Sequence, residues 1–389
     1  MIFLLLLLAC SATHAATPPV AEFAEHLIAA DLKGGYQVVI ADLNKDGKPD
    51  IIALASGLKE LVWYENPSWT RHVLAGEFNH MINLAAWDTD GDGIPEIVLA
   101  HEFANQAKNS IGILSLLTHG ADPLEPWKAT EIDRIPTSHR LRWADIYGNG
   151  KKVLVDAPLT GLKAEAPEYR GKTPLVFYKP GAWIRETIPE QNEGVQHGIY
   201  ITDWDGNGRE AILTASFIGI HLFRLGKDGV WTRTELAKGD PAPWPKSGSS
   251  DVAAGWLGSK PAKTRFLAAI EPWHGNEVSV YREDKKHTWQ RQVIDDSLDQ
   301  GHTILTADLN GDGTDEIIAG YRGKGRSVNI YYANNAKAER WTNHPLDSGG
   351  MAASSCAVAD LNADGRPDIV CIGSATANLK WYENKAPKK

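Results

Sequence analysis

Asp42-Leu43-Asn44-Lys45-Asp46-Gly47-Lys48-Pro49-Asp50 is the stretch that decides the fold, because closely similar turns begin at Asp88, Asp308 and Asp360. Oxygen-bearing side chains stand at positions 1, 3, 5 and 9 of each turn, and a glycine stands at position 6. Alternate side chains converge on one point only where the backbone turns sharply, which glycine permits. The short apolar runs on both sides of each turn predict strands rather than the helices of an EF-hand.

An alignment of the chain on these turns gives seven units spaced by roughly 50 residues, which suits four strands per unit. The turn beginning at Asp203 is one residue shorter, the one at Asp145 keeps fragments of the pattern, and the fifth, near Gly255, keeps only its position. We interpret the turns as structural sites for Ca²⁺ or Mg²⁺, because rigid strand-to-strand turns have no helix pair to open. The predicted ligands are Asp42, Asn44, Asp46, Asp50, Asp88, Asp90, Asp92, Glu96, Asp203, Asp205, Asn207, Asp308, Asn310, Asp312, Glu316, Asp360, Asn362, Asp364 and Asp368.

Each unit continues with an aromatic strand, such as residues 61–66, and an outer strand, such as residues 70–74. The last unit lacks its outer strand, and residues 25–29 resemble the missing piece. An N-terminal strand that completes the last blade closes the ring of a β-propeller and removes its exposed edges. The sequence therefore predicts an all-β, seven-bladed propeller that forms a single domain over residues 20–386.

The N-terminal residues 1–9 are almost wholly apolar and too short to span a bilayer. They resemble the apolar part of a secretory signal over residues 1–15. The stretch Leu7-Leu8-Ala9-Cys10 also resembles a lipobox, which would make Cys10 a lipid anchor, and both routes of processing stay open. We expect an exported protein, either periplasmic, secreted or lipid-anchored, without a transmembrane segment.

The formal net charge is -9, so no basic surface suited to phosphates is expected, and nucleic acid is not an expected partner. Cys356 and Cys371 lie on the two strands that flank the last acidic turn, where a disulfide and a pair of buried thiols are both compatible with the pattern. The sequence is compatible with a monomer or a simple oligomer.

Blade connectivity separates the two ends of the predicted propeller. The acidic turns join the first and second strands at one end, so the beginning of each inner strand lies at the other end, with the turn after the second strand. This second end collects most of the chemically useful side chains, and the longer segments 103–110 and 159–172 extend it. The candidate catalytic residues are His80, His101, His139, Arg140, His197, Glu271, His274, His302, Tyr321 and Arg322.

Histidine titrates near neutrality and binds metals, so several on one face form a candidate reaction site. His139, His197 and His302 each stand six residues before the first acidic position of their units, and they are candidate ligands for a catalytic Zn²⁺. Such a group suits an elimination, in which a histidine or tyrosine removes a proton next to a carbonyl and a cation or an arginine stabilises the enolate. Trp244 and Trp273 are candidate platforms for a sugar ring.

The acidic turns and their flanking strands resemble the FG-GAP/VCBS repeat family. The stretches 135–145 and 155–161, together with Gly35-Tyr36, residues 63–67 and Asn79-His80-Met81, resemble the propeller domain of aldos-2-ulose dehydratases and their single-domain bacterial relatives. The resemblance implies dehydration of a keto-sugar such as 1,5-anhydrofructose at a propeller site that holds a divalent metal. The fungal enzyme also carries cupin domains, for which this chain is too short.

We therefore expect a carbon–oxygen lyase that acts on a sugar or glycan, either a dehydratase of a keto-sugar or a polysaccharide lyase of uronate-containing glycans. A non-catalytic propeller that binds carbohydrate or protein is the alternative from another class. The residues alone do not choose the substrate, nor which histidines act as base and which as metal ligands.

Overall fold

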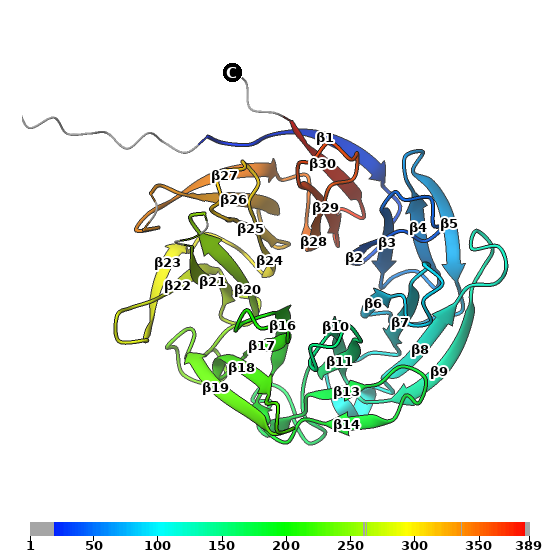
Figure 1. Ribbon diagram of the computed structural model, residues 1–389, viewed down its shortest axis with the longest axis horizontal. Coiled ribbons are helices and arrows are strands. Elements are labelled where there is room, and N and C mark those ends of the chain that lie inside the picture. Colours follow the sequence, from blue (N-terminus) through cyan, green and yellow to red (C-terminus); the bar gives the residue numbers. More distant parts are fainter. Residues whose placement is uncertain (1–18, 260, 262, 336, 386–389) are drawn as a thin grey trace, which may run out of the picture.

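Seven four-stranded antiparallel sheets surround a central channel, so the prediction of an all-β, seven-bladed propeller is confirmed (Figure 1). The computed structural model describes residues 19–385 apart from 260, 262 and 336. The predicted signal segment, Cys10 and residue 386 lie outside the described residues. Within the described part of the chain, no helix is long and apolar enough to cross a membrane.

The blades follow one another along the chain, and the first strand of each lies innermost. The first three blades comprise β2 (Gly35–Ala41), β3 (Asp50–Ala55), β4 (Leu61–Glu65) and β5 (Thr70–Ala75); β6 (Asn83–Trp87), β7 (Glu96–His101), β8 (Ile113–Thr118) and β9 (Lys128–Arg134); and β10 (Ser138–Ala144), β11 (Val153–Pro158), β13 (Val176–Tyr178) and β14 (Arg185–Thr187). The next three comprise β16 (Gln196–Thr202), β17 (Ala211–Ser216), β18 (Gly219–Leu225) and β19 (Trp231–Ala237); β20 (Asp251–Leu257), β21 (Thr264–Glu271), β22 (Glu277–Glu283) and β23 (Trp289–Asp295); and β24 (Gly301–Ala307), β25 (Glu316–Tyr321), β26 (Ser327–Ala333) and β27 (Trp341–Ser348).

The seventh blade joins the two ends of the chain. It comprises β28 (Ala353–Ala359), β29 (Asp368–Gly373) and β30 (Leu379–Lys385), and β1 (Glu22–Ala29) pairs with β30 as its outer strand. The predicted closure by an N-terminal strand is therefore present, and the blue β1 lies beside the red β30 in Figure 1. Of the two states that the sequence left open for Cys356 and Cys371, the structure has the disulfide, between opposed residues of β28 and β29.

Buried polar contacts lock neighbouring blades together in addition to the apolar packing between them. The hydroxyl of a tyrosine on a third strand donates to the aspartate at the end of the preceding blade's outer strand. Tyr178 reaches Asp133 at 2.7 Å and Tyr331 reaches Asp295 at 2.7 Å. Such bonds fix the angle between sheets, because a buried hydroxyl that lost its partner would cost free energy.

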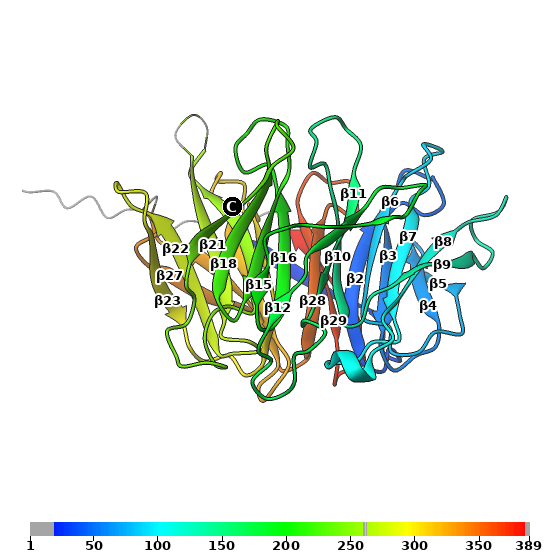
Figure 2. The ribbon, with the colours of Figure 1, turned by 90° about the horizontal axis from the view of Figure 1, so that it is seen from below.

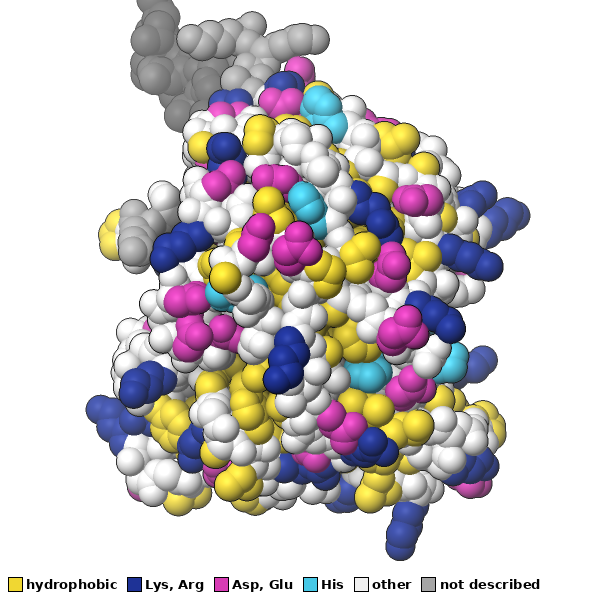
Figure 3. All heavy atoms as spheres, turned by 90° about the vertical axis from the view of Figure 1, so that its right-hand side faces the viewer, with side chains coloured by type: hydrophobic (Ala, Val, Ile, Leu, Met, Phe, Trp, Pro, Cys, Tyr) yellow, Lys and Arg dark blue, Asp and Glu magenta, His cyan; other side chains and the backbone are white. Residues whose placement is uncertain are grey.

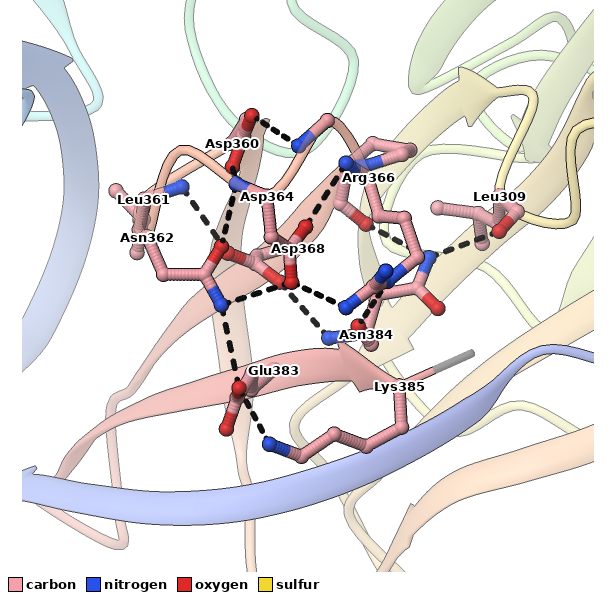
Figure 4. Close-up of polar contacts among 12 residues, drawn as sticks. Leu309, Asp360, Leu361, Asn362, Asp364, Arg366, Asp368, Glu383, Asn384 and Lys385 are labelled. Atoms are coloured by element: carbon pink, nitrogen blue, oxygen red, sulfur yellow. Dashed lines mark hydrogen bonds and ion pairs between the residues drawn. The ribbon is translucent and has the colours of Figure 1, made fainter. Parts of the chain in front are cut away.

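The acidic turns are cross-braced by the carboxylate at their ninth position. In the last turn, the two oxygens of Asp368 accept the amides of Leu361 and Asn384 (Figure 4). The side chain of Asn384 in turn donates to the carbonyl oxygens of Pro367 and Leu309, the latter in the preceding blade. The acidic turn, the aromatic strand and the next blade thus form one hydrogen-bonded unit.

Longer segments gather at the end of the propeller opposite the acidic turns. They include the 3-10 helix η1 (Ala107–Asn109), at the lower rim in Figure 2, and a small ribbon made of β12 (Lys172–Thr173) and β15 (Asn192–Glu193). The side of the molecule drawn in Figure 3 carries acidic and basic side chains interspersed, with no extended area of one sign. The buried histidine and arginine side chains lie instead at the channel.

Candidate functional site

A repeated backbone irregularity places the site residues. The pairing between the first and second strands shifts by one residue in five blades, so that Tyr36, His139, His197, His302 and Ser354 are each left out of the ladder. A β-bulge of this kind leaves one residue unpaired and changes the direction of its side chain. The count of six residues before each acidic turn therefore identified bulged positions that face one another around the channel.

His197, His274 and His302 form the tightest group of potential metal ligands. One ring nitrogen from each lies within 4.8 Å of the others. The Nδ1 atoms of His197 and His302 contact the carbonyl oxygens of Ser250 (3.2 Å) and Ser354 (2.6 Å), which places their protons on Nδ1. Their Nε2 atoms are then unprotonated, the arrangement that backbone carbonyls impose on metal-binding histidines, although Nη2 of Arg140 lies 3.5 Å from Nε2 of His197.

The donor set fits a divalent transition metal such as zinc. Nε2 of His302 is buried and has no hydrogen-bond partner among the described residues, whereas Nε2 of His197 and Nε2 of His274 face each other at 3.1 Å. Three neutral imidazoles around one point, with further positions for other ligands, are the pattern of catalytic zinc sites. The sequence placed His139 in this set, but the structure has His274 in that place.

His139 belongs instead to a second group, with Tyr36 and Arg140. Its Nε2 atom lies 3.0 Å from the Tyr36 hydroxyl and 3.1 Å from Nη1 of Arg140. Nη1 of Arg140 also approaches the Tyr36 hydroxyl at 3.4 Å. Arg140 can only donate, so Nε2 of His139 is the unprotonated, proton-accepting nitrogen.

Most of the cluster is buried, with His274 and Tyr36 partly exposed, and its surroundings are electropositive. Burial, reinforced by the positive charge of Arg140, holds the pKa values of His139 and His197 well below their usual range. Burial, together with Arg322 and Arg140, lowers the pKa of His274 to about 3. These histidines are therefore neutral near pH 7, available as bases or ligands.

Three guanidinium groups supply the positive charge, and Asp251 is the one carboxyl group that lines the same cavity as two of them. Arg140 is 6% exposed, and Arg142 donates to Asn83 and to the Leu141 carbonyl. Arg322 acts on the histidines as a neighbouring positive charge. Within the described residues, none of the three arginines forms an ion pair. A buried cation that lacks a partner is costly, so this site is built to receive negative charge.

A cavity of about 180 Å³ in the channel adjoins these groups and contains one carboxyl group, that of Asp251. Tyr36, Arg140, Arg142 and His302 line the same cavity. Burial raises the pKa of Asp251 to about 6, although Arg140 and Arg142 oppose the shift. Asp251 was missed by the sequence reasoning, because the degenerate fifth turn provides no acidic position from which to count.

Aromatic side chains from the longer segments cover the histidines. Phe103 lies against His139 (ring centroids 5.5 Å apart) and Trp273 lies against His274 (4.9 Å). Trp244, the other predicted platform, packs on Phe217 and donates its Nε1 hydrogen to the Glu168 carbonyl. Trp273 is therefore positioned at the site, whereas Trp244 supports the segment above it.

Four predicted catalytic residues lie apart from these two groups. His80 is exposed, and His101 contacts Ser115 within its blade. Glu271 is fully buried, and it accepts hydrogen bonds from Ser249, Tyr281 and Arg291 as part of a structural network. Tyr321 packs against the core between the fifth and sixth blades. The sequence assigned all of these residues to the same end of the propeller. It did not show which of their side chains reach the channel.

The acidic turns of the second and sixth units differ from those of the first and last. Asp88, Asp90 and Glu96 bring one oxygen each within 4.8 Å of the others. Glu96 and Glu316 each use only Oε2 to brace their turns, which leaves Oε1 for a cation. Asp50, like Asp368, uses both oxygens for backbone amides. A ninth-position glutamate is thus the better cation ligand.

The fold and these turns define the class: the chain is a seven-bladed β-propeller with FG-GAP-like repeats, which are recognised at residues 42–99 and 308–371. Its middle part, residues 112–284, matches the family described as the aldos-2-ulose dehydratase β-propeller domain. The propeller is related to the aldos-2-ulose dehydratase of Phanerodontia chrysosporium, with 23% identity over 292 residues. That match covers 67% of this chain but 31% of the fungal protein, so the chain spans about a third of its relative's length.

Two solved structures match the chain at low similarity. A Bacteroides fragilis protein described as a 6-phosphogluconolactonase is 14% identical, with a TM-score of 0.49, over 91% of this chain and 96% of its own. An Agrocybe aegerita lectin that recognises non-reducing terminal N-acetylglucosamine is also 14% identical, with a TM-score of 0.48, over 81% of this chain and 80% of its own.

Proposed function

We propose that this propeller is a lyase that eliminates water from a keto-sugar of monosaccharide size, such as 1,5-anhydrofructose. The observation that carries the proposal is the channel cluster, which combines neutral histidines with arginines that form no ion pair within the described residues. Elimination next to a carbonyl requires a proton acceptor and a means to stabilise the enolate, and the cluster offers both. The relationship to an aldos-2-ulose dehydratase supports the same reaction class.

In this proposal, Tyr36 and His139 receive the proton that leaves the sugar carbon. The Tyr36 hydroxyl faces Nε2 of His139 at 3.0 Å, so a proton accepted by the tyrosine oxygen is exchanged with the ring. Arg140 contacts both groups and fixes the position of the tyrosine oxygen beside the ring. The pair therefore provides a base without a charged histidine in the resting site.

Arg140 and Arg322 stabilise the negative charge that develops on the carbonyl oxygen. Arg140 is held by its contacts with Tyr36 and His139 before any substrate arrives, so little reorganisation of this group is needed during the reaction. His197, His274 and His302 would hold the divalent metal, which when bound polarises a carbonyl as a Lewis acid. Asp251 faces the same cavity and is the one carboxyl group there that is suited to protonating the departing hydroxyl.

The dimensions of the site favour a small sugar over a polymer. His139, His197 and His302 are each at most 2% exposed, and the adjoining cavity measures about 180 Å³. A polysaccharide lyase needs an open groove in which a chain can lie across the reacting groups. The unpaired arginines nevertheless suit a carboxylate, so a small uronate is the second candidate substrate.

We further propose that the protein is exported. The disulfide between Cys356 and Cys371 supports this, because such bonds persist in oxidising compartments. Mass determination of the mature protein from its source cells tests the proposal and separates cleavage near residue 15 from lipidation of Cys10. An unprocessed cytoplasmic chain would contradict it.

The elimination is tested by incubation of the purified protein with 1,5-anhydrofructose and with small uronates, followed by ultraviolet absorbance of the unsaturated product. We expect activity that falls at least a hundredfold in His139→Phe and Tyr36→Phe, and that is unchanged in His287→Ala, whose side chain is 86% exposed. Metal analysis should give about one zinc per chain, lost in His274→Ala. If no sugar in the panel gives absorbance, the enzyme reading fails and the binding propeller takes its place.

A further inference from the structure

A second cavity lies at the opposite end of the blades from the histidines, on the side of the acidic turns. It measures about 890 Å³, and its lining comes from blades four, five and six. It opens where the fifth unit has lost its acidic turn. Cavities of this size are typical of small-molecule and oligosaccharide sites.

Tryptophans form the apolar part of this cavity. Trp204, in the fourth acidic turn, and Trp289, at the beginning of β23, line it with ring centroids 5.8 Å apart. Trp256 lies behind them, and the guanidinium group of Arg265 sits 4.6 Å from the Trp204 ring and 4.3 Å from the Trp256 ring. Partly exposed tryptophans at a cavity wall offer faces on which sugar rings stack.

Three cations, Arg265, Arg282 and Lys337, and one carboxylate, Glu283, form the charged part, so cations predominate. Arg265 is anchored by the carbonyl oxygens of Asp203 and Trp204, at 3.3 and 3.1 Å. Arg282 is held by Gln292 and by the Lys337 carbonyl, and its buried Nε–H has no partner among the described residues. In that same part of the chain, neither guanidinium forms an ion pair.

The sequence of the fifth turn matches this reversal of charge. Residues 255–264 contain two lysines and no acidic residue, whereas the corresponding turns of the well-kept units carry several carboxylates. In a protein of net charge -9, a basic aromatic cavity at this place is a local departure. A pocket that keeps guanidinium groups unpaired gains stability when an anion binds.

We propose that this cavity is a binding site for an anionic oligosaccharide, in which Trp204 and Trp289 stack on sugar rings while Arg282 and Lys337 bind carboxylate or sulfate groups. The two tryptophan rings are inclined at 50°, so they do not form the parallel slot that would hold a nucleotide base. The site is separate from the histidine cluster and does not depend on the reaction proposed for it. It would hold an acidic glycan on the protein while the channel acts on small sugars.

The test is calorimetric titration of the full chain with tetragalacturonate, a sulfated carrageenan tetrasaccharide and neutral maltotetraose at low salt. We expect one or both acidic sugars to bind at least tenfold more tightly than the neutral one, and to weaken as salt is raised. Trp289→Ala and Lys337→Gln should each weaken binding at least fivefold. Because Lys337 is exposed, we expect Lys337→Gln to fold normally, so weaker binding in this variant would not be due to misfolding.

The matched control is Trp231→Ala, since Trp231 begins the outer strand of blade four as Trp289 does in blade five but does not line the cavity. His274→Ala should bind the acidic sugars as the wild type does. The proposal is overturned if no acidic sugar binds, if maltotetraose binds equally well, or if Trp231→Ala weakens binding as much as Trp289→Ala. Tighter, Trp289-dependent binding of ADP would overturn the assignment to sugars.

Discussion

At the scale of single residues, the candidate metal ligands come from two kinds of backbone position: β-bulges carry His197 and His302, and a turn carries His274. The count from the acidic turns identified His139, His197 and His302 because it measures the distance along a strand, which repeats from blade to blade. The candidate ligand group instead includes His274, which lies in a turn with its backbone in the left-handed region (φ 48°). No periodic pattern reports how a turn of that kind aims its side chain, so this part of the site required the structure.

A buried histidine away from the channel predicts how the protein responds to acid. Burial, together with the charge of Arg233, lowers the pKa of His221 to about 3. Between pH 6.5 and pH 3 the unfolded chain binds a proton at this position that the folded chain does not. The free energy of unfolding should therefore fall as pH falls, by up to roughly 1.4 kcal/mol per pH unit from this group.

Urea unfolding at a series of pH values checks this, with His221→Asn as the variant. Below pH 6.5, the slope of the free energy of unfolding against pH should be shallower in the variant. The difference should be up to roughly 1.4 kcal/mol per pH unit, which corresponds to one bound proton. His287→Asn, at an exposed position, should leave the slope as it is in the wild type. Equal slopes in all three proteins would show that His221 is protonated in the folded state.

At the scale of elements, regular strands were predicted and irregular segments were not. The alternation of apolar runs and turns gave the aromatic strands almost to the residue, because packing between blades demands it. The ribbon of β12 and β15 was not predicted, since its strands are only two residues long. The basic cavity was also missed. The fifth turn lacks the acidic motif, and the sequence does not show which residues of the neighbouring blades surround it.

The disulfide joins the two innermost strands of the blade that closes the ring. It links residues separated by 15 positions, for which the entropy of the unfolded chain predicts a stabilisation of about 3 kcal/mol. The double variant Cys356→Ala/Cys371→Ala should unfold at correspondingly lower urea. A reducing agent should destabilise the wild type to a similar extent and leave the variant unaffected. A wild type insensitive to reduction would indicate that the thiols are free in solution.

We propose that the acidic turns bind Ca²⁺ and that each bound ion stabilises the folded chain. A site occupied at a hundred times its dissociation constant contributes about 2.7 kcal/mol. Removal of calcium with EGTA should therefore lower the melting temperature, and added calcium should restore it. Glu96→Gln should reduce the calcium effect more than Asp50→Asn, because Glu96 keeps a free oxygen. An unchanged melting temperature would contradict a structural role for the ion.

At the scale of the whole molecule, stability depends on the pairing of β1 with β30. A chain that begins at Lys33 would leave the outer edge of the last blade exposed and would remove Asp31, whose charge acts on the buried Tyr64 of the first blade. We expect this chain to melt at a much lower temperature and to associate through the open edge. Size-exclusion chromatography and thermal unfolding test this, and a peptide of residues 19–32 should restore the monomer. A truncated chain as stable as the whole one would refute the closure.

The architecture itself was predictable, because the same pattern of strands and turns recurs in seven units. Even the two degenerate units were counted correctly, since spacing survives when motif residues are lost. The chemistry was predictable only in part, since it depends on side chains that different blades bring together. Tyr36, Asp251 and Arg142 meet at the channel although their blades are far apart in the sequence.

The β-bulges have a consequence for how such a site can change over time. Each bulge lies at the equivalent position of its blade. In this chain the five positions hold one tyrosine, three histidines and one serine. A single codon change at Ser354 would add another ring to the constellation without disturbing any ladder. The propeller can therefore exchange the reactive side chains at its bulged positions while its strands and blades stay unchanged.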